Sequence, residues 1–249
     1  MANSPSGDSV VDRVVRLLAA FPEGTVLLPL SELAERAGLP LSSTHRLVRQ
    51  LAAHGLLDLG AGGSVKLGLH LWELVSRNSP TLELRTVALP FMEDIHTVLR
   101  QNVNLAVLDG EDALFVERLS RPGSVVNRAT VAGRLPVHIS SAGLALMAFQ
   151  SRTVQTAYLE GLEARGFAAA EVLRQHLAEA ARNGYAQLAG AIDPETWGIA
   201  VPILDAKGQA VAALGVVVPL DEVRLREVVR ALQLASRRIR SGLEDLRRD

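Results

Sequence analysis

Residues 39–57 read LPLSSTHRLVRQLAAHGLL, and this stretch decides the fold of the N-terminal part of the chain. Apolar side chains recur at helical spacing after the proline, and Gly55 is a typical stop. The positions that share one side of a helical wheel, and so would pack inward, are Thr44, Leu47, Val48 and Leu51. The stretch contains two arginines and no acidic residue, although the whole chain has a formal net charge of −1. We therefore predict a helix over residues 42–54 with one cationic face.

The cationic face has the chemistry of a DNA-recognition surface. Short hydroxyl residues at the start of the helix would let it approach base edges in the major groove, and arginines further along can fork onto a guanine or bind phosphates. Two arginines are also ordinary on a solvated helix face. The candidate DNA-contacting residues are Ser42, Ser43, Thr44, His45, Arg46, Arg49 and Gln50, with Lys66 as a candidate phosphate contact on the segment that follows.

The flanking segments favour the DNA-binding interpretation. Two helices are predicted before this one, VVDRVVRLLAA over residues 10–20 and SELAERAG over residues 31–38, with Ser31 as the N-cap of the second. After it, the strand-like stretches LLDL and SVKLGL are joined by the glycine-rich GAGG of residues 60–63, which indicates a hairpin. Two helices, a turn, a third helix and a hairpin together predict a winged helix-turn-helix.

The polar stretch SRNSPT over residues 76–81 marks the predicted domain boundary. We expect a winged helix-turn-helix domain over residues 1–76, a linker helix region over residues 77–101 and a second domain over residues 102–249. In the second domain, the strand-like stretches are VNLAVLD, ALFVERLS, GIAVPILD and VAALGVVVPL, and the helical ones are SSAGLALMAF, AAAEVLRQHLAEAARNG and EVRLREVVRALQLASRRIRSGLEDL. This order indicates an α+β domain with a central, largely antiparallel sheet.

Composition argues against several classes of protein. The chain has no cysteine, which excludes a disulfide framework, thiol catalysis and a cysteine-ligated zinc site. Its first residues are polar without an apolar signal region, and its longest apolar runs are too short to span a membrane. The six histidines are dispersed, so we expect no metal site and no cofactor. We expect a cytoplasmic protein with no membrane partner.

A serine hydrolase is the enzyme class that the sequence most nearly suggests. His138, Ser140 and Ser141 lie close together, but their flanks do not match the G-x-S-x-G elbow that exposes a nucleophilic serine. We therefore expect no catalytic residues and no enzymatic activity.

The ordered combination of these motifs resembles the isocitrate lyase regulator (IclR) family of bacterial transcription regulators. The stretches that carry the resemblance are LSELAERAGLPLSSTHRLVRQLAAHGLL, GAGGSVKLGLHLWEL, NVNLAVLDG, AGRLPVHISSAGLALMAF and GYAQLAGAIDPETWGIAVPILDAKGQAVAALGV. The resemblance implies a GAF-like effector-binding and oligomerisation domain, a helical linker, and dimers that often pair into tetramers. It also implies that repression is the commoner mode of action.

Several positions depart from the family pattern at the implied effector pocket. Leu144 stands where relatives have lysine, and Gly198 stands where they frequently have cysteine. Positions that are often acidic in relatives hold Leu188, Gly190 and Ala191, and the serine positions of the last strand hold Gly215 and Val217. A carboxylate entering such a pocket would lose hydration without full replacement, whereas an apolar or aromatic ligand would gain from burial. Trp197 has two interpretations, a core or interface residue and a pocket wall. The predicted effector-binding residues are Asn127, Leu135, Ser140, Ser141, Ala142, Gly143, Leu188, Trp197, Gly198, Gly215 and Val217.

These observations predict a ligand-responsive transcription regulator. It would act as a homodimer or homotetramer, bind a two-fold operator in double-stranded DNA through the helix over residues 42–54, and respond to an apolar or aromatic small molecule. Two alternatives stay open. One is an enzyme built on the α+β domain with the N-terminal domain as a DNA-binding tether, and the other is a ligand-independent architectural DNA binder.

Overall fold

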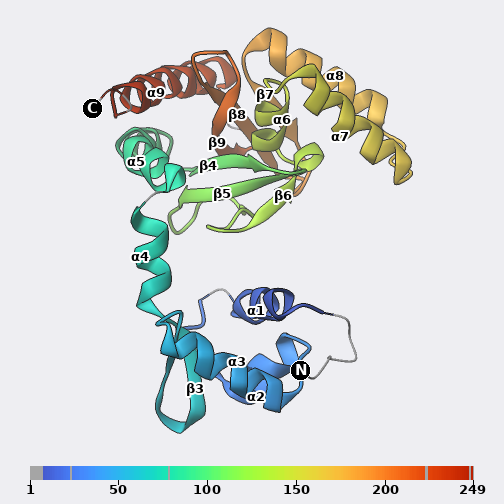
Figure 1. The fold of residues 1–249 in the computed structure, drawn as a ribbon. Helices are drawn as coiled ribbons and strands as arrows, with labels where there is room; N and C mark the ends of the chain where they lie inside the picture. Colours follow the sequence, from blue (N-terminus) through green and yellow to red (C-terminus); the bar gives the residue numbers. More distant parts are fainter. Residues whose placement is uncertain (1–7, 23, 78, 222–223, 247, 249) are drawn as a thin grey trace. The chain divides into compact units, whose positions relative to one another are not determined.

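The structure is a computed structural model that describes residues 8–22, 24–77, 79–221, 224–246 and 248. It divides into two compact units, Met1–Ser79 and Pro80–Asp249 (Figure 1). We call them the N-terminal unit and the C-terminal unit. Each has its own core of buried hydrophobic residues.

The N-terminal unit is mainly helical and carries a small three-stranded antiparallel sheet in the order β1-β3-β2. Its described elements are α1 (Val10–Ala19), β1 (Leu28–Pro29), α2 (Leu30–Arg36), α3 (Leu41–Ala53), β2 (Leu57–Leu59), the 3₁₀ turn η1 (Ala61–Gly63), β3 (Ser64–Leu67) and α4 (Leu69–Arg77). The inward-facing side chains of α3 complete its core with those of α1, α2 and the hairpin β2–β3. The helices and hairpin therefore follow the predicted winged helix-turn-helix.

Local details of this unit differ from the sequence-based expectations. Helix α2 begins at Leu30 after Pro29, so Ser31 lies inside the helix and is not its N-cap. Strand β3 ends at Leu67, and the chain then turns into α4, which the sequence reasoning had not identified. Gly68 permits this close approach of the backbone, because a Cβ there would lie 2.0 Å from the backbone oxygen of Gly55.

The C-terminal unit is built on a six-stranded sheet in the order β6-β5-β4-β9-β8-β7, and every neighbouring pair is antiparallel. The strands are β4 (Asn102–Asp109), β5 (Asp112–Leu119), β6 (Arg134–Pro136), β7 (Ala186–Ala189), β8 (Thr196–Leu204) and β9 (Ala210–Pro219). The helices are α5 (Pro80–Leu99), η2 (Val137–Ile139), α6 (Ser141–Met147), α7 (Arg152–Ala164), α8 (Ala170–Asn183) and α9 (Leu225–Leu246). The mixed fold class, with an N-terminal helix-turn-helix and an antiparallel second domain, is confirmed.

Helices cover both faces of this sheet (Figure 1). Helices α5 and α9 pack on one face, and α6, with α7 and α8 beyond it, packs on the other. Strands β8 and β9 place their large apolar side chains, such as Ile199 and Leu214, under α5 and α9. Their small ones, such as Ala200 and Ala213, face α6. The expected start of the last helix at Glu222 lies outside the described residues, and its described part begins at Leu225.

One partly buried ion pair joins α5 to the sheet. Arg85 on α5 donates from Nε to Oε2 of Glu117 on β5 over 2.5 Å. Glu117 is only 6% exposed, and its other carboxylate oxygen accepts the backbone N–H of Arg118. Both oxygens of the Glu117 carboxylate thus accept a hydrogen bond. One of the two donors, Arg85, belongs to α5, the helix that follows the N-terminal unit in the chain.

Loss of this ion pair should destabilise the C-terminal unit. Arg85→Ala leaves the buried Glu117 carboxylate without its cation, which should lower the free energy of unfolding by about 1–3 kcal/mol. Urea unfolding followed by Trp197 fluorescence, in a Trp72→Phe background, measures it. The matched control is Arg174→Ala, which removes an exposed arginine from surface ion pairs and should leave the midpoint unchanged. Equal midpoints for the two variants would contradict a stabilising role for Arg85.

Candidate functional site

The outer face of α3 is cationic and open to solvent. The exposed side chains of this face are Ser42, His45, Arg46, Arg49 and Gln50, and Ser43 is half-buried. Among the described residues, neither arginine has an ion-pair or hydrogen-bond partner, so both guanidinium groups are free to bind another molecule. The opposite side of α3 is fixed, because Leu47, Val48 and Leu51 are buried in the core. The helix is therefore a rigid support for a free positive face.

Thr44 has to be removed from the predicted DNA contacts. Its side chain is completely buried, and its hydroxyl donates to the carbonyl of Pro40 over 3.2 Å. The helical wheel had already placed it on the inward side, and the structure shows that its position in the first turn does not expose it. Lys66 on β3 is exposed but lies 3.6 Å from the carboxylate of Asp58 on β2, so its charge is shared with that neighbour.

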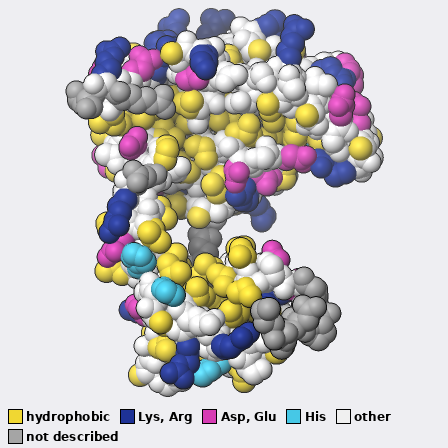
Figure 2. Space-filling model, viewed as in Figure 1, with side chains coloured by type: hydrophobic (Ala, Val, Ile, Leu, Met, Phe, Trp, Pro, Cys, Tyr) yellow, Lys and Arg dark blue, Asp and Glu magenta, His cyan; other side chains and the backbone are white. Residues whose placement is uncertain are grey.

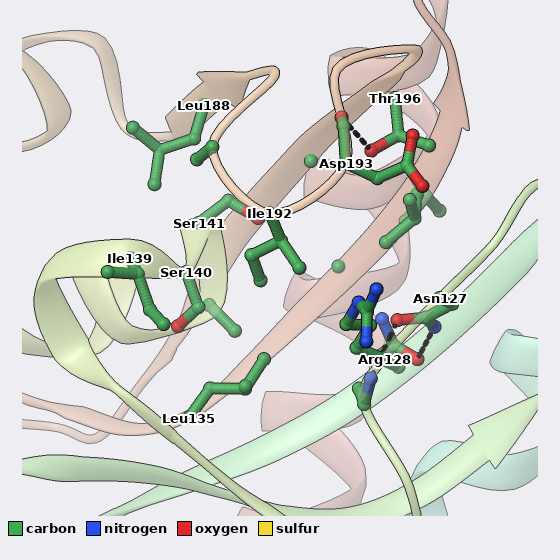
Figure 3. Close-up of a pocket in the computed structure, with 18 of the residues that line it drawn as sticks. Asn127, Arg128, Leu135, Ile139, Ser140, Ser141, Leu188, Ile192, Asp193 and Thr196 are labelled. Carbon is green, nitrogen blue, oxygen red and sulfur yellow. Dashed lines mark hydrogen bonds between the residues drawn. The ribbon is translucent and has the colours of Figure 1, made fainter.

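The C-terminal unit contains a cavity of about 560 Å³, open mouth included, on the α6 face of its sheet (Figure 3). Its walls come from β4, β5, β8 and β9, from the segment before β6, from the start of α6 and from the β7–β8 connection. The predicted effector-binding residues that line it are Asn127, Leu135, Ser140, Ser141, Ala142, Leu188, Gly198, Gly215 and Val217. Residues far apart in the sequence thus meet at one site.

Trp197 and Gly143, which were predicted to line the pocket, do not. Successive residues of a strand point to opposite faces, so Gly198 on the cavity face places Trp197 on the other face. There Trp197 packs against the hydrophobic cluster that the sheet forms with α5 and α9. Gly143 lies within α6 and donates its N–H to Oγ of Ser140 over 2.9 Å. A Cβ on Gly143 would lie 2.5 Å from Cα of Val137, so this position faces η2.

The cavity also has walls that the sequence reasoning missed. These residues are Asn104, Phe115, Val126, Arg128, Ala129, Ile139, Ala191, Ile192, Asp193, Thr196 and Val216. Asn104 carried a usable signal, since it is a polar residue inside the otherwise apolar strand VNLAVLD. Arg128 carried none, because it lies in a segment without periodic pattern.

Side chains of the sheet hold one cavity wall in place. The backbone of residues 124–130 belongs to no helix or strand. Asn127 donates from Nδ2 to Oδ1 of Asn104 over 2.9 Å, and its own Oδ1 accepts the N–H of Ala129 over 3.0 Å. The carbonyl of Ala129 accepts from Nη1 of Arg118 over 2.9 Å. The wall is therefore anchored to both β4 and β5.

The cavity has an apolar side and a polar side (Figure 3). Leu135, Ile139 and Leu188 lie on one side, and Arg128 and Asp193 lie on the other. The polar side is not visible from the positions that depart from the family pattern, because at those positions polar groups are lost. The cavity can bind a ring against these apolar side chains, while Arg128 offers a positive charge to a polar substituent of the ring.

Next to the cavity, His138 and Tyr158 fix the start of α6. Nδ1 of His138 lies 2.9 Å from the Tyr158 hydroxyl, and its ring packs on Phe167 with centroids 4.7 Å apart. Burial raises the pKa of Tyr158 to about 12, and burial together with Arg165 lowers the pKa of His138. Nδ1 of His138 thus faces Tyr158, Oγ of Ser140 accepts from Gly143, and within the described residues no hydrogen bond joins these two side chains as in a nucleophile–base pair.

Within the residues that the structure describes, no helix combines the length and apolar character needed to cross a bilayer. In that same part of the chain, histidine and carboxylate side chains do not gather in groups of three or more that could hold a metal ion.

Comparison with known proteins identifies both units. The IclR helix-turn-helix domain model matches residues 10–59, and the model of the bacterial transcriptional regulator IclR C-terminal domain matches residues 79–241. The transcriptional repressor IclR of Escherichia coli is 30% identical over 195 residues, which cover 74% of this chain and 71% of that protein. The E. coli regulator XynR is 26% identical, with 82% of this chain and 83% of that protein covered.

A solved structure gives a stronger match. A crystal structure of an IclR homolog from Microbacterium hydrocarbonoxydans, complexed with 4-hydroxybenzoate, superposes with a TM-score of 0.86. The two sequences are 40% identical, and the match covers 95% of this chain and 100% of that one.

The His138 environment predicts a pH dependence of stability. Its pKa is lower in the folded chain than the ordinary value of about 6.5, so folding disfavours its protonation. The wild type should have its full stability above pH 6.5 and lose stability as the pH falls below about 6.5. The His138→Gln variant lacks this contribution, so its thermal midpoint should fall less between pH 7.5 and pH 5.5. If the thermal midpoints of the two proteins fell equally with pH, the lowered pKa of His138 would be contradicted.

Proposed function

The chain belongs to the IclR family of ligand-responsive, DNA-binding bacterial transcriptional regulators, and we propose that it represses transcription from a two-fold operator until an aromatic ligand binds. The observation that carries the proposal is the free cationic face of α3 in a chain that also contains a cavity lined by residues from both halves of the second sheet. A cavity in the C-terminal unit is not expected for an architectural DNA binder that responds to no ligand. Because its partner is bacterial DNA, the protein would work in the cytoplasm.

Helix α3 is the recognition element of this proposal. Arg46 is exposed one turn after the hydroxyl residues, where it can reach a base edge in the major groove. Arg49 follows one turn later, where a phosphate is the closer target. Lys66 on the wing is a weaker phosphate contact, because Asp58 already shares its charge.

The effector side of the proposal rests on the cavity and on the homolog with 4-hydroxybenzoate. An aromatic ring would lie against Leu135, Ile139 and Leu188 on the apolar side of the cavity. Burial of its apolar surface would contribute roughly 25 cal/mol per Å². Repression is the proposed mode because relatives of this chain include the transcriptional repressor IclR and the acetate operon repressor.

A second copy of the chain would cover an apolar surface on the N-terminal unit (Figure 2). Figure 2 shows hydrophobic side chains gathered on one face of this unit. The exposed apolar residues of its first and last helices are Val10, Val11 and Val15 on α1, and Leu69, Trp72, Leu74 and Val75 on α4. Trp72 is 66% exposed, which is unusual for so large an apolar side chain. We propose that these helices form a homodimer interface, which would present two copies of α3 to the operator.

Arginine substitutions on α3 test the DNA interface. Duplexes selected from a random pool by the wild type would serve as the operator. Arg46→Ala should weaken operator binding by about 1–3 kcal/mol and relax one base position. Arg49→Ala should weaken binding to all sequences and reduce the slope of log affinity against log salt by about one.

The matched control for these variants is Arg36→Ala. Arg36 is also an exposed arginine of the helix-turn-helix, but it is already paired with Glu32 on α2. Its loss should leave operator affinity unchanged. Wild-type affinity in the Arg46→Ala/Arg49→Ala double variant would remove the recognition-helix assignment.

Trp72→Glu tests the proposed dimer interface. A carboxylate on the exposed apolar surface cannot be buried against a second copy without losing its hydration, so it should favour the monomer. Sedimentation at micromolar concentration should show a dimer or larger assembly for the wild type, and a smaller species with weakened operator binding for the variant. An unchanged assembly with unchanged affinity would place the interface elsewhere.

A further inference from the structure

Arg128 is the one cationic side chain among the residues that line the described cavity. Within the described part of the chain, no carboxylate oxygen lies within 4.0 Å of its guanidinium group, and the group makes no hydrogen bond. Asp193 lines the same cavity, yet the two do not form an ion pair. The positive charge therefore stands unneutralised at the edge of a hollow that has an apolar opposite side (Figure 3).

The backbone on both sides of Arg128 is fixed. Asn127 before it is tied to Asn104 on β4, and Ala129 after it is tied to Asn127 and to Arg118 on β5. These bonds engage the N–H and carbonyl of Ala129 and the side-chain amide of Asn127, but none of them uses the Arg128 side chain. The segment therefore positions a free guanidinium group at little further cost in backbone entropy on binding.

A guanidinium group in this setting favours one class of ligand substituent. Its planar fork of N–H donors matches the two oxygens of a carboxylate, and such charged, bidentate hydrogen bonds are stronger than neutral ones. Arg128 is exposed, so the bidentate geometry, and not a dry surrounding, carries the attraction. A ring packed on Leu135, Ile139 and Leu188 leaves its polar substituent to the side where Arg128 lies.

We propose that Arg128 is the specificity-determining residue of this pocket and binds the carboxylate of an aromatic monocarboxylic acid. The inference rests on the proposed function, in which an aromatic ligand occupies the cavity, and it adds the residue and the charge that the ligand must carry. It replaces the sequence-based expectation that a carboxylate would lack a partner there. Asp193 takes no part in holding the acid, because its Oδ1 accepts the backbone N–H of Glu195 and its charge has the wrong sign.

Isothermal titration calorimetry on the full chain tests whether Arg128 binds the ligand carboxylate, with two probes of the same shape. One is 4-hydroxybenzoate, and the other is its uncharged analogue 4-hydroxybenzamide. The wild type should bind the acid more tightly than the amide. Arg128→Met keeps the length and removes the charge, so it should weaken acid binding by about tenfold to a hundredfold and leave amide binding unchanged. Arg128→Lys should restore part of the acid affinity, because a point charge replaces the bidentate fork.

Asp193→Asn is the matched control, since asparagine can still accept the Glu195 N–H that shapes the turn. Removing this negative charge should leave acid binding equal or stronger. Equal acid affinity in the wild type and Arg128→Met would overturn the assignment, as would a parallel loss of acid and amide binding in a variant whose circular dichroism and melting are normal. A wild type that binds the amide as tightly as the acid overturns this inference alone. A wild type that binds neither overturns the proposed aromatic effector as well.

Discussion

The alternation of side chains along β8 and β9 is the constraint on which the C-terminal unit depends. One face of these strands carries large apolar residues such as Ile199 and Leu214, which α5 and α9 cover. The other face carries Gly198 and Gly215, and the space left by their missing side chains becomes the cavity floor. A Cβ at Gly198 would lie 2.8 Å from Oγ of Ser141, so a larger residue there would have to displace that hydroxyl at the start of α6. The same strands therefore build a dense core on one face and a binding site on the other.

Strand β5 serves both faces of the sheet. Glu117 reaches Arg85 on α5, the helix that follows the N-terminal unit in the chain, and the next residue, Arg118, holds the carbonyl of Ala129 in the cavity wall. Two adjacent residues thus connect the wall and that helix through hydrogen bonds of 2.5 Å and 2.9 Å. A ligand that moves the wall acts on a strand to which the helix is directly bonded.

The sequence predicted what local periodicity controls. The wheel of α3 separated the exposed arginines from the buried leucines, and the apolar runs located β4, β5, β8 and β9. Prediction from the sequence failed where the position of a residue depends on contacts with residues distant in the chain. Trp197 was misplaced because a shift of one residue along a strand reverses the face, and the sequence does not fix that register. Arg128 was missed because bonds from β4 and β5, not a helical or strand pattern, set its position.

The central claim is that occupancy of the cavity changes the affinity of the chain for DNA, and one titration tests it most directly. The binding of a fluorescent selected operator to the full-length protein would be measured with and without saturating 4-hydroxybenzoate, after calorimetry has shown that the compound binds. The account predicts that operator affinity changes by about fivefold or more, and that the operator changes the affinity for the ligand by the same factor. Unchanged operator affinity with the cavity occupied would contradict it.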